Sequence, residues 1–561
     1  MANFLLPVLT TVARLTKAHF VRQIRQSSAV QEQFLYSLLR AYQDTELGRQ
    51  YQLREIKSID RFQERIPILP YSSYEPYIER VARGEPNILT PDPVIYLNMT
   101  SGSTGKQKLI PVTKRSQKVA QRANLASIGF AVEALRSRGQ QIRKFLLPSS
   151  AQLLGRTSGG IEFGPTSVRD IRLGKFLYQQ TLAHPYETMQ PADSLARHYL
   201  CLLFALRDAS MGGMAANFPM LALRTCEYLE QYAEELIEDL EVGAIAPWLK
   251  LEPELRLRLE RQLTQAPDRA AQLREVLKRE GRLTPKLAWP NLSFIGTARG
   301  GTSDFYFERF PTYFGDTPIF GGIYASAEAI FGIYHDFNDD GSILAIESGF
   351  FEFIPEAQWE AEHPKTLLFN EVSVGERYRI LVTNYCGLYR YDIGDVVEVV
   401  GFYNQVPKLV FRHRRGGLLS STTEKTTEFH VIQVMQTLQR EFALSLEEFC
   451  VTLSEHDVPA HYLVNIELTP GHTLSDPQAF LDRFDRHLQE IHVSYEVKRR
   501  DQVPPPRLQI LAPGSFAIIH QRLRERGIPE TQLKIPHISE DRKFLAGLSV
   551  QQEVRLPEDY N

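Results

Sequence analysis

Apolar residues recur at helical spacing in two long stretches of the chain. Within residues 1–50, positions such as Leu35, Leu38 and Tyr42 stand three or four residues apart, which places them on one face of a helix. A second stretch, from about residue 195 to residue 283, alternates apolar and charged faces in the same way. We expect helices in both stretches and interpret those of the second as surface helices.

Between these stretches lie short runs rich in β-branched and aromatic residues, which predict strands. Each run is bounded by turn residues, and they include PVIYLNMT, KFLLP, LSFIGT, TPIFGGIYA, FFEFIP and DVVEVVGFY. Strands interleaved with helices predict an α/β protein with mixed sheets. After KLVFRHRRGGLLS the pattern changes to shorter alternating helices and strands, which predict a small α+β domain. We therefore expect a large N-terminal domain over residues 1–414 and a small C-terminal domain over residues 415–561.

Length and charge narrow the class of partner. A chain of 561 residues exceeds what one hydrophobic core usually supports, which agrees with two domains. Lys and Arg total 64 against 67 for Asp and Glu, so the charge balance gives no reason to expect a nucleic acid as partner. A small molecule is the expected ligand. The four cysteines stand far apart and no run resembles a membrane span, so we expect a cytoplasmic protein without disulfides or structural zinc.

The first segment with candidate chemistry is TSGSTGKQK, which directly follows a predicted strand. Glycines permit unusual dihedral angles, so backbone N–H groups and short hydroxyl side chains can approach phosphate oxygens there. The spacing is not that of a Walker A loop. A plain surface loop is the alternative. The residues concerned are Thr100, Ser101, Gly102, Ser103, Thr104, Gly105 and, at the end of the segment, Lys108.

The second segment is GGIYASAE, where an apolar strand ends in an aromatic residue, a hydroxyl and a carboxylate. Ligands of α/β proteins bind at strand ends. Tyr324 can stack on a purine there, and Glu328 can give magnesium a hard oxygen ligand beside phosphates. Ala325 and Ser326 lie between them. The alternative is a core tyrosine and an exposed glutamate.

The third segment is YRYDIGD, which leads into the strand-like run VVEVVGF. Asp395 at its end can accept hydrogen bonds from two ribose hydroxyls. An ordinary hairpin turn at Ile-Gly-Asp explains this segment of the sequence equally well.

In order and spacing, these segments resemble the Gretchen Hagen (auxin-responsive) acyl acid-amido synthetases, a branch of the acyl-adenylating, firefly luciferase-like superfamily. The resemblance covers nearly the whole chain. It implies that the first loop binds ATP phosphates, that the second segment contacts nucleotide and magnesium through Glu328, and that the third holds the ribose. The nucleotide-binding residues implied are Thr100, Ser101, Gly102, Ser103, Thr104, Gly105, Tyr324, Ala325, Ser326 and Asp395.

Two further segments match this family more specifically than the superfamily. FRHRRGGLLS followed by EKTTE is similar to the family's hinge, which implies that Arg414 lies at the hinge and that Lys425 approaches the nucleotide. QLKIP near the C-terminus resembles the segment whose lysine reaches the α-phosphate, which assigns that role to Lys534. Without the resemblance, the Arg-rich run is interpreted as a solvated linker and Lys534 as an ordinary solvated lysine.

The function implied is ATP- and magnesium-dependent conversion of a carboxylic acid to an acyl-adenylate, followed by transfer of the acyl group to an amine, expected to be an amino acid. Magnesium on Glu328, with Lys108 and Lys534, would offset the repulsion between carboxylate and phosphate. We expect the acid pocket near residues 147–163 and 300–307, from their placement between motifs. An acyl-CoA ligase and a catalytically silent nucleotide-binding protein are the alternatives.

Overall fold

The computed structural model describes residues 5–100, 108–301, 303–414, 418–422, 424–500, 502–529 and 533–560. They divide into two units. The first comprises Met1–Gly300 and Phe310–Phe411, and the second comprises Gly301–Arg309 and Arg412–Asn561. Both contain helices and sheets, so the expected mixed α/β class is confirmed.

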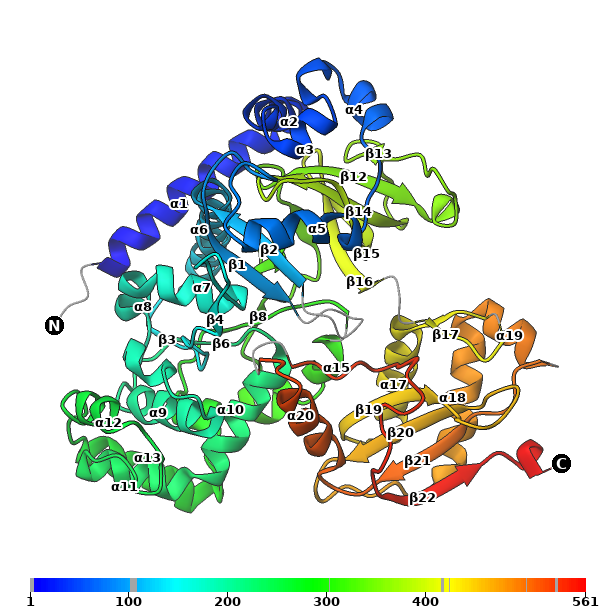
Figure 1. Ribbon diagram of the computed structural model, residues 1–561. Coiled ribbons are helices and arrows are strands. Elements are labelled where there is room, and N and C mark those ends of the chain that lie inside the picture. The colour runs from blue at the N-terminus through cyan, green and yellow to red at the C-terminus, as the bar shows by residue number, and fades with distance from the viewer. Residues whose placement is uncertain are drawn as a thin grey trace. The chain divides into compact units, whose positions relative to one another are not determined.

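The N-terminal stretch is helical, as its spacing predicts. It forms α1 (Leu5–Ile24) and α2 (Ser27–Tyr42), followed by a short third helix. Helix α1 lies along α6 (Lys114–Ser137), as Figure 1 shows. A Cβ atom on Gly129 of α6 would come within 2.4 Å of the carbonyl oxygen of Ala13, so the close approach of the two helices requires a glycine.

The second helical stretch also forms, but one of its helices differs from the interpretation. The surface-helix interpretation is wrong for α9 (Ser194–Leu206), which is buried along nearly its whole length. Apolar residues stand on most faces of α9, as expected for a helix inside a core. The other helices of this stretch are α10 (Pro219–Gln231), α11 (Ala233–Val242), α12 (Pro253–Glu260) and α13 (Pro267–Glu280). The remaining α-helices of the first unit are α3 (Glu46–Gln50), α4 (Ile59–Arg65), α5 (Tyr71–Ala82), α7 (Thr166–Leu173), α8 (Lys175–Thr181), α14 (Pro285–Ala288) and α16 (Phe310–Phe314).

Three sheets make up the rest of the first unit. A four-stranded sheet has the order β2-β1-β5-β4, with β1 (Val94–Thr100), β2 (Lys108–Thr113), β4 (Gly155–Arg156) and β5 (Glu162–Gly164). A parallel sheet has the order β3-β6-β7-β8, with β3 (Phe145–Leu146), β6 (Gly213–Ala215), β7 (Phe294–Gly296) and β8 (Ile319–Phe320). The eight-stranded sheet has the order β13-β12-β14-β15-β16-β11-β10-β9. Its strands are β9 (Ile323–Ala325), β10 (Ile330–Ile333), β11 (Ser342–Leu344), β12 (Phe350–Pro355), β13 (Leu367–Leu368), β14 (Arg377–Asn384), β15 (Leu388–Tyr403) and β16 (Val406–Arg414).

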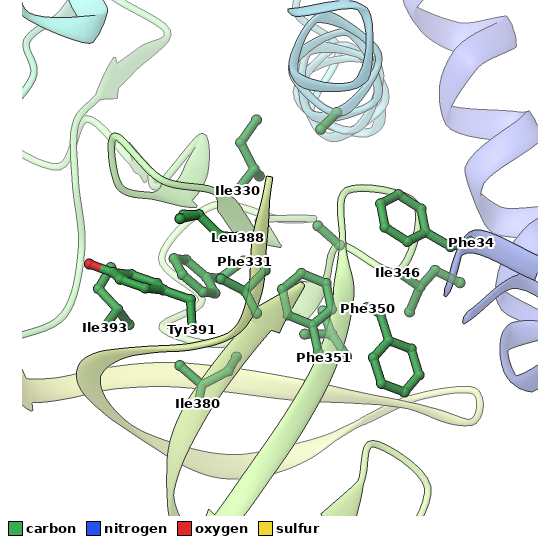
Figure 2. Packing of buried hydrophobic residues seen from close by; sticks show 14 of the residues in the cluster. Phe34, Ile330, Phe331, Ile346, Phe350, Phe351, Ile380, Leu388, Tyr391 and Ile393 are labelled. Carbon is green, nitrogen blue, oxygen red and sulfur yellow. The ribbon is translucent and has the colours of Figure 1, made fainter. Parts of the chain in front are cut away.

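The main core joins the N-terminal helices to the eight-stranded sheet. Figure 2 shows the rings of Phe331, Phe350 and Phe351 gathered above the strands, with Tyr391 beside them and Phe34 reaching in from α2. Burying such aromatic side chains stabilises the fold by about 2 kcal/mol or more each. This core fixes the edge of the sheet where β9 and β10 turn.

The second unit is a small α+β fold. Its four-stranded sheet has the order β19-β20-β21-β22, with β19 (Leu446–Leu453), β20 (Tyr462–Leu468), β21 (Arg507–Leu511) and β22 (Val550–Arg555). Helix α18 (Pro477–Ile491) packs on β21 and β22. The other elements are β17 (Leu418–Leu419), β18 (Thr426–Thr427), α15 (Ser303–Phe307), α17 (Glu428–Glu441), α18 (Pro477–Ile491), α19 (Val493–Arg499) and α20 (Ser515–Glu525). Among the described helices of both units, none has the length and apolarity to cross a membrane.

Candidate functional site

The first predicted segment is the connection of a hairpin. Strands β1 and β2 run antiparallel, and Thr100 pairs directly with Lys108. The ammonium group of Lys108 lies 5.3 Å from the centre of the Tyr71 ring, close enough for a cation–π contact. Thr100 and Lys108 therefore mark the two ends of the loop. The predicted phosphate-binding residues of the loop itself, Ser101, Gly102, Ser103, Thr104 and Gly105, lie outside the described residues.

The second and third segments meet through a hydrogen bond. The Tyr324 hydroxyl donates to Oδ2 of Asp395 at 2.8 Å, and Asp395 is 2 % exposed. One face of the Tyr324 ring stacks on Phe331, with ring centres 5.0 Å apart. Two residues 71 positions apart in sequence, one on β9 and the other on β15, are thus side by side.

A bulge in β15 positions Asp395. Along β14, Arg379 pairs with Val396 while Leu381 pairs with Asp392, so β15 carries extra residues between these pairs. Gly394 lies in this bulge at φ +82°, a conformation that glycine adopts without strain. The Ile-Gly-Asp residues therefore belong to a bulge inside a long strand, and the alternative of a hairpin turn is wrong.

Glu328 lies on a turn whose backbone is fixed by hydrogen bonds from other segments. The backbone N–H groups of Glu328 and Ala329 donate to Oγ of Ser326, at 3.2 and 3.3 Å. Asn98 of β1 donates to the carbonyl of Ala327 at 2.9 Å, and Asn384 donates to the carbonyl of Glu328 at 2.8 Å. The turn is thus fixed by its own serine and by two buried asparagines.

The Glu328 side chain is buried but retains one unshared oxygen. It is 5 % exposed, and its Oε1 accepts from the Tyr391 hydroxyl at 3.1 Å. Figure 2 shows that hydroxyl directed away from the packed rings. Within the described part of the chain, Oε2 has no hydrogen-bond donor. A buried carboxylate with one oxygen available suits a magnesium ion that takes its other ligands from phosphates and water. The described residues contain no group of three or more metal-ligating side chains.

A pocket opens beside this turn, inside the first unit. It is lined by apolar and polar side chains from β1, β2, α6, α7, β9, β10, the turn that carries Glu328 and the turn between β14 and β15. Its polar lining includes the Arg169 guanidinium, which is 5 % exposed and donates to Oδ1 of Asn98 at 3.0 Å and to Oδ1 of Asp170 at 2.6 Å. Burial raises the pKa of Cys386, another lining residue, to about 12. The ranges 147–163 and 300–307, where an acid pocket was expected, contribute no side chain to this pocket.

Arg390, in the third segment, has a structural role. Its guanidinium forms an ion pair with Glu352, with Nη2 and Oε1 3.0 Å apart. Its Nη1 donates to the carbonyls of Gln63 and Ile66, at 2.7 and 2.9 Å. Arg390 therefore ties the connection after α4 to the sheet, while Asp395, five residues later, belongs to the site.

The other predicted residues lie in the second unit. Arg414 ends β16. Lys425 is exposed in the turn between β17 and β18, at φ +58°, and its N–H donates to Oγ of Ser420 at 2.7 Å. Lys534 is exposed on an extended segment beside β19. The structure thus gathers Tyr324, Asp395 and Glu328 in one unit and places these three cationic residues in the other.

Sequence reasoning missed the residues that support the site. Asn98, Arg169 and Asn384 come from three different segments. Asn98 and Asn384 stand in largely apolar strands, whereas Arg169 lies among other polar residues of α7, and only the packing of the segments shows what each contacts. A buried polar residue within a strand-like run, as at Asn98, is the one signal the sequence offers, because such a group needs a partner.

Comparison with known proteins decides the family. Residues 16–319 match the GH3 family N-terminal domain, residues 342–414 the GH3 family central domain and residues 429–543 the GH3 family C-terminal domain. The chain belongs to the GH3 family. The resemblance to this family is thereby confirmed, with the three GH3 matches lying between residue 16 and residue 543.

Relatives of this GH3 chain include plant synthetases. It is 26% identical over 497 residues to the indole-3-acetic acid-amido synthetase GH3.10 of Arabidopsis thaliana, covering 82% of this chain and 83% of that protein. It is 27% identical over 471 residues to the jasmonoyl-L-amino acid synthetase JAR4 of Nicotiana attenuata, covering 80% of this chain and 78% of that protein.

Solved structures share the GH3 fold. The GH3.15 acyl acid amido synthetase superposes with a TM-score of 0.83 at 22% identity, over 95% of each chain. A 2-hydroxyisobutyryl-CoA ligase in its postadenylation state superposes with a TM-score of 0.56 at 12% identity, over 93% of this chain and 91% of that one. The fold is therefore common to amide-forming and thioester-forming ligases.

Proposed function

We propose that this GH3 chain is an ATP-dependent acyl acid-amido synthetase, which activates a carboxylic acid as acyl-AMP and conjugates it to an amine, an amino acid by analogy with its relatives. The observation that carries the proposal is the meeting of Tyr324 with Asp395, and of Tyr391 with Glu328, beside a pocket. These groups come from segments far apart in the chain, so their convergence supports a functional site at this place.

The first half-reaction brings together two anions, the acid and the α-phosphate. Asp395, oriented by Tyr324, would hold the ribose, while Thr100 and the loop after it would hold the phosphates, with Ala325 and Ser326 beside the nucleotide. Lys108 and Lys534 would supply positive charge where negative charge develops on the phosphates in the transition state. Magnesium, held by Glu328, would supply further charge neutralisation. Catalysis then consists of positioning and electrostatics, without a protein nucleophile.

The pocket beside Glu328 is our candidate for the acid. Its walls combine small apolar residues with buried polar groups, the composition expected of a small-molecule site. It adjoins the turn that carries Glu328, so an acid within it would direct its carboxylate toward the phosphates. The expectation of an acid pocket near residues 147–163 and 300–307 stays a separate proposal.

The second half-reaction transfers the acyl group to the amine and releases AMP. We propose that the large domain over residues 1–414 and the small one over residues 415–561 change their relative orientation between the two steps, with Arg414 at the hinge. Lys425 and Lys534 would then approach the nucleotide in only one of the two arrangements. All four cysteines are free thiols, which fits the reducing cytoplasm as the place of action.

The test is ATP–pyrophosphate exchange with magnesium against aromatic, jasmonate-like and fatty acids, followed by mass spectrometry with amino acids or coenzyme A. Acid-dependent exchange and an amide product would support the proposal. A thioester product would assign the chain to the CoA ligases, which share the fold. ATP binding without exchange under any acid would identify a silent nucleotide-binding protein. A Lys534→Ala variant should lose exchange while still converting added acyl-adenylate to amide.

A further inference from the structure

A short segment from the middle of the chain belongs to the second unit. Gly301–Arg309, which contains α15, leaves the first unit after Gly300 and returns to it at Phe310. Gly300 and Gly301 have φ values of +85° and +59°, which turn the chain sharply at the point of departure. The second unit is therefore built from two separate pieces of sequence.

Two polar side chains of this segment bind β19. The Tyr306 hydroxyl donates to Oε2 of Glu448 at 2.7 Å, and Nη1 of Arg309 lies 3.2 Å from Oε2 of Glu447. Tyr306 is 6 % exposed, and burial raises its pKa well above the usual value, so the phenol keeps its proton and donates it. Hydrogen bonds to a buried carboxylate are among the stronger ones in proteins.

The same Glu448 carboxylate holds a second buried group. Nε2 of His537 lies 3.1 Å from Oε1 of Glu448, so Tyr306 and His537 use its two oxygens. The His537 ring is fully buried and stacks on Phe449, with ring centres 4.3 Å apart. Phe305 of α15 packs edge-on against both rings, with centres 5.1 Å away in each case.

His537 in turn fixes the backbone of the segment that follows Lys534. The Val451 N–H donates to the His537 carbonyl at 2.8 Å, and the Ser539 N–H donates to the Val451 carbonyl at 3.0 Å. The His537 N–H donates to Oε1 of Glu428 at 2.8 Å. The segment thus lies against β19 as an added extended stretch.

Lys534 projects from this anchored segment. Its neighbours Leu533 and Ile535 are each 1 % exposed, whereas Lys534 is exposed. Alternate residues of an extended chain point to opposite sides. The position of the ammonium group is therefore set by the backbone between its two buried neighbours and His537.

We propose that Tyr306 and His537 are positioning residues for Lys534, acting through the carboxylate they share on Glu448. This inference rests on the proposed function, in which Lys534 reaches the α-phosphate. Helix α15 is then a structural part of the unit that carries Lys534, although it lies more than two hundred residues earlier in the chain. We call the contacts of Tyr306 and His537 with Glu448 the anchor. Loss of one of these contacts lowers the fraction of molecules in which Lys534 is correctly placed, and it affects only the half-reaction that uses Lys534.

The test compares Tyr306→Phe with Tyr495→Phe. Tyr495 is a matched control because it is buried in the same unit and donates to a carboxylate, Oδ1 of Asp485, at 2.8 Å. Tyr306→Phe should slow acid-dependent ATP–pyrophosphate exchange about tenfold, the effect of losing one hydrogen bond to a charged group. Its conversion of added acyl-adenylate to amide should be unchanged. Tyr495→Phe should change neither rate.

Two variants at the histidine separate hydrogen bonding from packing. His537→Phe keeps a ring against Phe449 but cannot donate to Glu448, so it should show the same selective loss as Tyr306→Phe. His537→Gln retains an N–H donor and should recover most of the exchange rate. Equal losses in both half-reactions for all these variants would mean that the residues only stabilise the fold, and would overturn the proposal.

Hydrogen exchange tests the anchor without reference to activity. In Tyr306→Phe, the amides of Val451 and Ser539 should exchange at least about tenfold faster, and in the Tyr495→Phe control they should not. If the wild-type chain activates no acid, the proposed function fails, yet this comparison still decides whether α15 anchors the segment. Unchanged amide protection in Tyr306→Phe would overturn the inference even in an active enzyme.

Discussion

Replacing Arg390 by methionine should destabilise the first unit without a direct effect on the chemistry. The guanidinium is paired with Glu352 and donates to the carbonyls of Gln63 and Ile66 and to Oγ1 of Thr366. Arg390 and Glu352 are 5 % and 1 % exposed. Methionine fills much of the same volume but leaves a buried carboxylate without its counter-charge.

The magnitude follows from that unpaired charge. Removing one partner of a buried ion pair costs about 3–5 kcal/mol, a large part of the roughly 5–15 kcal/mol that holds a typical domain folded. Thr366 and Gln63 still donate to the carboxylate, at 2.7 and 3.0 Å, so we expect the lower end, about 3 kcal/mol. Adding Glu352→Gln removes the charge and should recover about 1–2 kcal/mol of this loss.

Urea unfolding followed by tryptophan fluorescence measures this loss. All three tryptophans, Trp248, Trp289 and Trp359, lie in the first unit, so the signal reports on the unit that contains Arg390. A matched control is Arg377→Met on the neighbouring strand. The Arg377 side chain is 33% exposed and lies 3.7 Å from Glu398, so its loss should cost less than about 1 kcal/mol.

Two results would refute this reasoning. If Arg390→Met unfolds within about 1 kcal/mol of the wild type, the ion pair does not hold the connection after α4 to the sheet. If ATP binding is lost while stability is unchanged, Arg390 belongs to the nucleotide site instead of the core.

Other substitutions test the site and the core. Tyr324→Phe removes the donor to Asp395 and should raise the KM for ATP about tenfold in steady-state assays, with the KM for the acid unchanged; equal effects on both would contradict the assigned role. His184 accepts from the Leu147 N–H at 3.3 Å, and burial lowers its pKa from 6.5 to about 4. The unfolded chain therefore binds the proton more tightly, and the stability from neutral His184 is present above pH 6.5 and lost as the pH falls toward 4. Between pH 7 and pH 5, urea unfolding of wild type should lose about 2 kcal/mol more than that of His184→Gln; identical losses would exclude this histidine as the source. With its pKa near 12, Cys386 should resist iodoacetamide at pH 8 until the protein unfolds, as mass spectrometry would show; rapid labelling of the native protein would contradict its burial.

The sequence determined the class of fold and the order of the chemical segments. Helical spacing around Leu35 and Leu38, and aromatic-rich runs such as the one at β12, depend on residues close together in the chain, so local patterns were sufficient to predict them. The motifs containing Tyr324, Glu328 and Asp395 could be found for the same reason, since each is a contiguous set of letters.

Tertiary structure alone decided which neighbours these residues have. Nothing near Glu328 in the chain indicates that Asn98 and Asn384 hold its turn, or that Tyr391 donates to its carboxylate. The apolar run of α9 is itself a signal of burial, but which elements pack around that helix could not be predicted from its own residues.

Tertiary structure also divides one short segment, YRYDIGD, between the core and the candidate site. Arg390 and Asp395 are five residues apart on one strand, yet Arg390 pairs with Glu352 in the core and Asp395 accepts from Tyr324 in the candidate site. Likewise Tyr306 belongs to the second unit because of Glu448, more than a hundred residues later. Local sequence sets which element each segment forms, whereas partners distant in sequence are fixed only when the chain has closed its long loops and buried its core.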